Sequence, residues 1–151
     1  MRLTRMTAVE IVSVDERDSN WEDHSPRFRV YLHSSGGSTT RGGTATYDVT
    51  GADALQVIDW AQRRAGNTHT FAVALVYDDR AEEALNPGRG RGLVWLVGMD
   101  GNDDPTSEEE VDAQTRMLLR RGDPVIVPHA DQIPPGHQDL DNDGAVPTDR
   151  A

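Results

Sequence analysis

The chain contains no cysteine and no lysine, so all 15 of its basic side chains are arginines. Without cysteine there is no thiolate nucleophile, no disulfide and no thiolate zinc site. Without lysine there is neither a lysine Schiff base nor a Walker A phosphate loop. These two absences exclude several enzyme classes.

Aromatic residues are also scarce, at 5% of the 151 residues, and hydrophobic residues make up 36%. This composition supplies one hydrophobic core and predicts one compact domain. No run approaches the ~18 apolar residues of a membrane-spanning helix. We therefore expect a soluble, cytoplasmic protein that makes no membrane contact.

The negative charge is unevenly distributed along the chain. Residues 1–77 hold 9 acidic and 8 basic side chains, whereas residues 78–151 hold 17 and 7, which accounts for the net charge of −11. A negative field repels phosphate backbones and attracts basic surfaces. The sequence therefore favours a basic protein partner over nucleic acid.

Alternating apolar residues predict five strands, and capping residues followed by apolar stripes predict two helices. The strands are expected at 8–14, 27–33, 44–49, 70–77 and 92–99, and the helices at about 52–65 and 107–121. The order strand, strand, strand, helix, strand, strand, helix is typical of an α+β fold. We expect a single-layer, mixed but mainly antiparallel sheet of about five strands, with one helix on a face and a second, peripheral helix.

The domain is predicted to span residues 1–133, and residues 134–151 are predicted to form a disordered acidic tail because they have almost no apolar content. The strand at 92–99 carries apolar residues on both faces, so we expect it in the interior of the sheet. The segment 34–43 is rich in glycine and serine and is predicted to be a mobile loop. A further short strand is possible at 125–127.

The first helix has the clearest sequence signals. Thr50 and Asp53 have the spacing of a capping box, and Gly66 can end the helix in a left-handed conformation. Its apolar stripe is formed by Ala54, Leu55, Ile58, Ala61 and Ala65. This assignment buries Ile58 and leaves Asp59 in water.

Two motifs resemble ligand loops only in part. Gly88, Gly90 and Gly92 form a G-x-G-x-G run, but it precedes a strand and lacks the helix N-terminus that binds phosphate. Asp139, Asp141 and Asp143 match the first half of a calcium loop, although Arg150 stands where the bidentate glutamate belongs. We interpret the first as a flexible loop and the second as a weak calcium candidate within the solvated tail.

No catalytic constellation is found, because the five histidines show no metal-ligand spacing and no nucleophile elbow occurs. No cofactor is predicted. Our first hypothesis is a non-catalytic acidic interaction domain, of the inhibitor, immunity or accessory type, that binds a basic protein surface. The partner-binding residues predicted for it are Asp78, Asp79, Arg89, Arg91, Glu108, Glu109 and Glu110.

The alternative hypothesis is a domain that binds a small molecule or an anion and has a possible enzymatic activity. Its pocket is expected between the sheet and the helix, near Trp95, Tyr77 and Arg91. A deep pocket with convergent polar groups would favour this alternative, whereas a flat acidic face would favour the first hypothesis. The sequence does not predict an oligomeric state.

Overall fold

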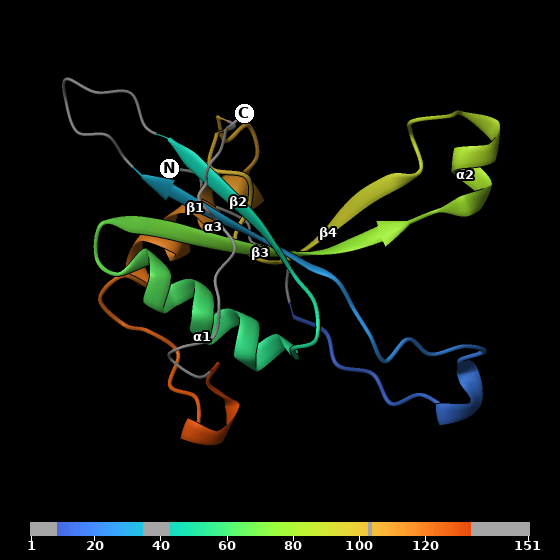
Figure 1. Ribbon diagram of the computed structural model, residues 1–151, viewed down its shortest axis with the longest axis horizontal. Helices are drawn as coiled ribbons and strands as arrows, with labels where there is room; N and C mark the ends of the chain where they lie inside the picture. The colour runs from blue at the N-terminus through green and yellow to red at the C-terminus, as the bar shows by residue number, and fades with distance from the viewer. Residues whose placement is uncertain (1–8, 35–42, 103, 134–151) are drawn as a thin grey trace, which may run out of the picture.

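The computed structural model describes residues 9–34, 43–102 and 104–133, and they form an α+β domain (Figure 1). Its elements are η1 (Glu16–Asp18), β1 (Phe28–Ser34), β2 (Thr44–Val49), α1 (Ala54–Ala65), β3 (His69–Asp78), α2 (Arg80–Leu85), β4 (Arg91–Val97), α3 (Glu108–Leu119) and η2 (His129–Asp131). Apart from the strand predicted at 8–14, the predicted elements appear in the predicted order.

The sheet has four strands in the order β2-β1-β3-β4, and every neighbouring pair is antiparallel. β2 and β3 therefore run parallel on either side of β1, and α1 connects them. The prediction of five strands is slightly off, because residues 9–14 are extended but pair with no described strand. Residues 125–127 are not a strand either.

Helix α1 covers one face of β1 and β3 and forms the main core with them. Its N-cap is Asp53, which forms the capping box with Gln56, so the helix begins later than the Thr50 box predicted. Gly66 ends it with a φ of 58°. The buried face consists of Val57, Ala61 and Ala65, packed against Phe28, Val30, Leu32, Phe71 and Val73. The predicted stripe therefore shares Ala61 and Ala65 with the buried face, but the structure buries Val57 and leaves Ala54 and Leu55 exposed.

Helix α3 packs on the opposite face of the sheet. Its N-cap is Ser107, whose side chain accepts a hydrogen bond from the backbone N–H of Glu110. Met117 is the one buried residue of the helix and contacts the cluster of Ala72 and Met99. This single anchor fits the predicted peripheral position of the second helix.

β4 lies at the edge of the sheet, so the expectation that this strand is interior was wrong. Together, β3, α2 and β4 form an arm that projects from the body of the domain (Figure 1). Its tip is held by Glu83, which accepts hydrogen bonds from the backbone N–H groups of Gly88 (2.8 Å) and Gly90 (3.0 Å). The glycine run predicted to be a loop is therefore fastened to α2.

Several predictions lie outside the described residues. They include most of the 34–43 loop, the acidic tail from residue 134 and the calcium candidate Asp139, Asp141 and Asp143. Among the helices of the described part, none has the length and apolar content that crossing a bilayer requires.

Candidate functional site

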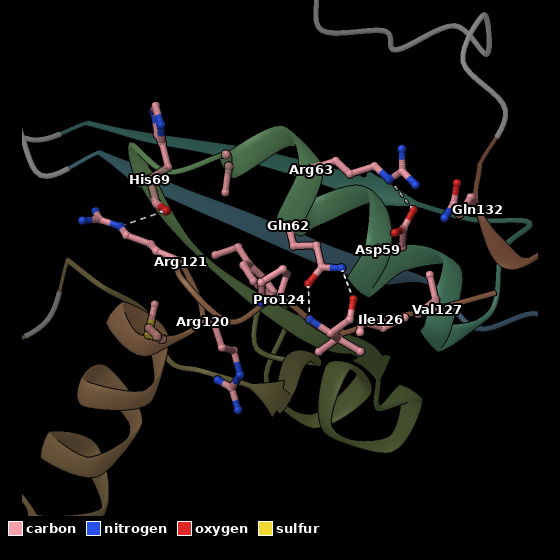
Figure 2. Close-up of a pocket in the computed structure, with 15 residues that line it drawn as sticks. Asp59, Gln62, Arg63, His69, Arg120, Arg121, Pro124, Ile126, Val127 and Gln132 are labelled. Atoms are coloured by element: carbon pink, nitrogen blue, oxygen red, sulfur yellow. Dashed lines mark hydrogen bonds and ion pairs between the residues drawn. The ribbon is translucent and has the colours of Figure 1, made fainter. Parts of the chain in front are cut away.

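A groove of about 400 Å³ lies between α1 and the segment that follows α3 (Figure 2). Its lining includes the buried side chains of Phe71 in β3 and Met117 in α3, together with Gly66 and Gln132. The sequence could not indicate this groove, because its walls come from α1, β3 and residues 120–132.

The segment 124–127 is held against α1 by one side chain. The Nε2 atom of Gln62 donates to the carbonyl of Val125 at 2.6 Å, and the N–H of Val125 donates to Oε1 of Gln62 at 2.9 Å. The side-chain amide of Gln62 thus makes the two hydrogen bonds that the backbone of a neighbouring strand would make with Val125. Val127 is buried beyond this bridge, whereas Ile126 is fully exposed.

Asp59 lies on the groove wall and is only 3% exposed, so the prediction that it faces water was wrong. Its Oδ2 atom is 2.9 Å from Nε of Arg63, one turn later in α1. The contact has the distance of an ion pair but not the geometry of a hydrogen bond, because Oδ2 has no hydrogen-bond partner. A buried carboxylate oxygen in this state retains acceptor capacity.

Two arginines after α3 form the other end of the groove. Arg121 donates from Nε to the carbonyl of His69 at 3.2 Å and from Nη2 to the carbonyl of Thr68 at 3.4 Å. Arg120 has a buried Nη1 atom with no hydrogen-bond partner. In the described part of the chain, Asp59 Oδ2 and Arg120 Nη1 are the two buried side-chain atoms without such a partner, and both residues line the groove.

The groove therefore has a polar group at each end and apolar side chains between them. Figure 2 shows Asp59 beside Arg63 at one end and Arg120 at the other, with the Gln62–Val125 bridge between them. The arginines 63, 120 and 121 outnumber the single carboxylate of the lining, so the local charge is positive on an acidic protein. Such a surface is suited to an elongated ligand with an anionic group.

The predicted partner-binding residues form two separate groups. Asp78, Asp79, Arg89 and Arg91 lie on the projecting arm, and Figure 1 places its α2 apart from α3, where Glu108, Glu109 and Glu110 lie. Several have structural roles. Asp78 pairs with Arg91 (2.7 Å), which lowers the pKa of its carboxyl group, and Asp79 caps α2.

Glu110 also has internal partners. The N–H and hydroxyl groups of Thr106 both donate to its Oε1 atom, at 2.7 and 3.0 Å, and they lower the pKa of its carboxyl group. The predicted residues therefore do not converge on one described site.

The pocket predicted near Trp95, Tyr77 and Arg91 is not formed. Trp95 contacts Tyr31 (ring centroids 5.2 Å apart) on the face that carries α3. Tyr77 is exposed on the opposite face, because it alternates in register with Leu75 and Val73. These side chains therefore cannot line a common pocket.

A second polar cluster joins β1, β2 and the loop after β4. The N–H of Gly101 donates to Nε2 of His33 at 3.0 Å, so the ring proton must lie on Nδ1. Nδ1 then donates to the hydroxyl of Thr44 (3.2 Å), which donates to Oδ1 of Asn102 (2.8 Å). Burial lowers the pKa of His33, and Asp100 acts in the opposite direction. The cluster is internally satisfied and behaves as a structural network.

No protein-family model, no curated protein and no solved structure matches this chain. Within residues 9–34, 43–102 and 104–133, no three or more His, Asp or Glu side chains are grouped to hold a metal ion. The sequence analysis missed Asp59 and Arg120, which both line the groove. The i, i+4 spacing of Asp59 and Arg63 was a signal for an ion pair, but not for its burial.

Proposed function

We propose that this protein is a non-catalytic binding domain that takes an elongated, amphipathic small molecule in the α1 groove. The observation that carries the proposal is that Asp59 and Arg120, two residues that line one groove, each have a buried side-chain atom without a hydrogen-bond partner. A buried polar group without a hydrogen bond costs about 1–3 kcal/mol, although the ion pair with Arg63 offsets part of this cost at Asp59. A ligand that supplies the missing hydrogen bonds therefore gains affinity.

The two ends of the groove specify complementary ligand groups. Asp59 requires a hydrogen-bond donor, such as an ammonium or hydroxyl group, whereas Arg120 requires an anionic acceptor, such as a carboxylate. Phe71, Met117 and Ile126 favour an apolar body between them. A zwitterion with a hydrocarbon spacer has all three properties.

A series of linear ω-amino acids tests this proposal, because the spacer length is the variable. We expect backbone amide resonances of the groove residues to shift on titration with 4-aminobutanoate through 8-aminooctanoate, with one preferred length. The alkylamine and the alkanoate of that length each lack one charge and should bind at least tenfold more weakly, since a lost charge-assisted hydrogen bond costs about 1.5–3 kcal/mol.

Two variants separate the ends of the groove. Asp59→Asn should weaken binding of the ω-amino acid and leave binding of the alkanoate unchanged. Arg120→Gln should also weaken binding of the ω-amino acid, but it should leave binding of the alkylamine unchanged. Arg89→Gln is the matched control, because Arg89 lies on the projecting arm of β3, α2 and β4 and does not line the groove. Shifts without length preference, or equal affinity in all variants, would reject the groove as a ligand site.

The second candidate function is the acidic interaction domain for a basic protein, which the net charge of −10 in residues 78–151 supports. Steering by this field should make association with a captured partner slow down between about 0.05 and 0.5 M salt. Neutralising Glu108 and Glu109 to glutamine should reduce that salt dependence. A captured partner that is itself acidic would reject this candidate.

A further inference from the structure

The N-terminal arm, which we define as residues 9–21, exposes an unusual amount of apolar surface. Its five large apolar side chains are between 70% and 93% exposed; they are Val9, Ile11, Val12, Val14 and Trp21. Figure 1 shows this segment running outside the sheet. Large apolar side chains that are exposed close together in one segment are a common feature of interaction sites.

Residues 9–14 have the sequence pattern of a strand but lack a strand partner. In an extended strand, Val9 and Ile11 would lie on one face, and Val12 and Val14 would lie on the other, with Glu10 and Ser13 between the members of each pair. Within the described chain these residues form no backbone hydrogen bonds with another segment. Their N–H and C=O groups are therefore available for pairing with a sheet edge.

The edge formed by β4 has the complementary properties. β4 pairs with β3 on one side only, and its Val94 and Leu96 are 51% and 46% exposed. Its single charged residue, Arg91, lies at the start and is paired with Asp78. Edge strands that avoid association carry charges, prolines or bulges that block pairing, and β4 has one irregularity only, opposite Val73 and Ala74.

The other sheet edge is less suitable. β2 carries Thr44, Thr46 and Asp48 on one face, and Asp48 is paired with Arg27 and Arg29. Its polar side chains match an arm of valines and isoleucine poorly. β4 is therefore the apolar edge of the sheet.

We propose that residues 9–14 of one copy add as a fifth strand to the β4 edge of a second copy, in a reciprocal dimer. Residues 15–27 would span up to about 43 Å when extended, so they form a long tether between residues 9–14 and β1. Among the described residues of a single chain, both residues 9–14 and the outer edge of β4 are unpaired. Exchange between copies satisfies both at once.

The surface that the proposed pairing exchanges is small. Residues 9–14 and the seven residues of β4 supply thirteen residues on each copy. Standard interfaces use about 20–30 residues per partner and bury about 1,600 Å² in total. We therefore expect a weak dimer that forms in a concentration-dependent way.

Disulfide trapping tests the pairing directly, because the natural chain has no cysteine. Val12→Cys chains mixed with Leu96→Cys chains should form a heterodisulfide under mild oxidation. Val12→Cys mixed with Leu85→Cys is the control, because Leu85 is an exposed side chain on α2. A heterodisulfide yield no higher than that of the control would overturn the proposal.

The mass of the full-length chain provides the second measurement. Sedimentation should give a concentration-dependent dimer, and Val12→Pro and Leu96→Lys should each weaken dimerisation at least tenfold, whereas Leu85→Lys should not. Far-UV circular dichroism and a cooperative melt check that each variant is folded. A natural chain that stays monomeric, or an intramolecular disulfide formed by the Val12→Cys/Leu96→Cys double variant at high dilution, would overturn exchange between copies.

Discussion

The backbone N–H of Gly101 donates a hydrogen bond to Nε2 of His33, with a nitrogen-to-nitrogen distance of 3.0 Å. This contact joins the loop after β4 to the interior strand β1 across 68 positions of sequence. It requires a neutral ring, because a proton on Nε2 would face the proton of the amide.

We predict that the protein loses stability in mild acid through His33. Burial lowers the pKa of this side chain below its usual value of about 6.5, so the unfolded chain binds the proton more readily. The contribution of His33 to the free energy of unfolding is fully present above about pH 6.5. It decreases as the pH falls towards the pKa of His33 in the folded protein. Urea midpoints measured between pH 5 and 8 should show this slope.

The matching variant is His33→Gln, which has no titrating ring. This variant should be less stable than the natural chain at pH 8. Its urea midpoint should lack the part of the pH dependence that comes from the titration of His33. His24→Gln serves as the control, because His24 is exposed and its ion-pair partner Glu22 is exposed as well. Identical slopes in the natural chain and in His33→Gln would contradict the prediction.

Gly101→Ala should destabilise the same contact by steric overlap. A Cβ atom at this position would lie 2.8 Å from carbon atoms of the His33 ring, well inside van der Waals contact. We expect a loss of about 1–3 kcal/mol in the free energy of unfolding. Gly122→Ala is the control, since its Cβ would have no neighbour within 4 Å. Equal urea midpoints for the two variants would refute this expectation.

The buried face of α1 can be checked with a pair of alanine substitutions. Val57 is 0% exposed, so Val57→Ala should cost about 1.5–3 kcal/mol through lost burial and a residual cavity. Leu55 is 46% exposed, and Leu55→Ala should cost less although it removes more atoms. Chemical denaturation of both variants gives the comparison. A larger loss in the free energy of unfolding for Leu55→Ala than for Val57→Ala would support the apolar stripe expected from the sequence.

Gln62→Ala should release the segment 124–127 from α1. The substitution removes two hydrogen bonds to Val125, each with a net value of about 0.5–1.5 kcal/mol. Hydrogen exchange of the Val125 and Val127 amides should accelerate, whereas the amides of β3 serve as the internal control. Gln62→Glu should have a similar effect, because a carboxylate has no proton to donate to the Val125 carbonyl. Unchanged exchange at Val125 would show that the bridge is dispensable.

The local elements of this protein were predictable from short stretches of sequence. Alternation located β1, β2 and β3, and the glycine at position 66 ended α1 where expected. These features depend on the chain within a few residues, where the periods of the strand and the helix and the capping groups dominate.

Features that depend on contacts between distant residues were decided by the tertiary structure. The i, i+4 rows of α1 allowed two adjacent stripes, and packing against Phe28 and Phe71 selected the one through Val57 and buried Asp59 with it. The strand pattern of residues 9–14 likewise predicts that they pair with another strand. It does not indicate whether that strand belongs to their own sheet.

The sequence by itself determined the types of the elements in the sheet and the two longer helices, the end of α1 at Gly66 and the uneven charge, because each follows from neighbouring residues or from composition. The tertiary structure alone decided that β4 is an edge and that Asp59 and Arg120 line one groove. The physical reason is that strand order and groove walls join segments up to 73 positions apart, such as Asp59 and Gln132. Their packing energy is shared among many side chains, and no local pattern records it.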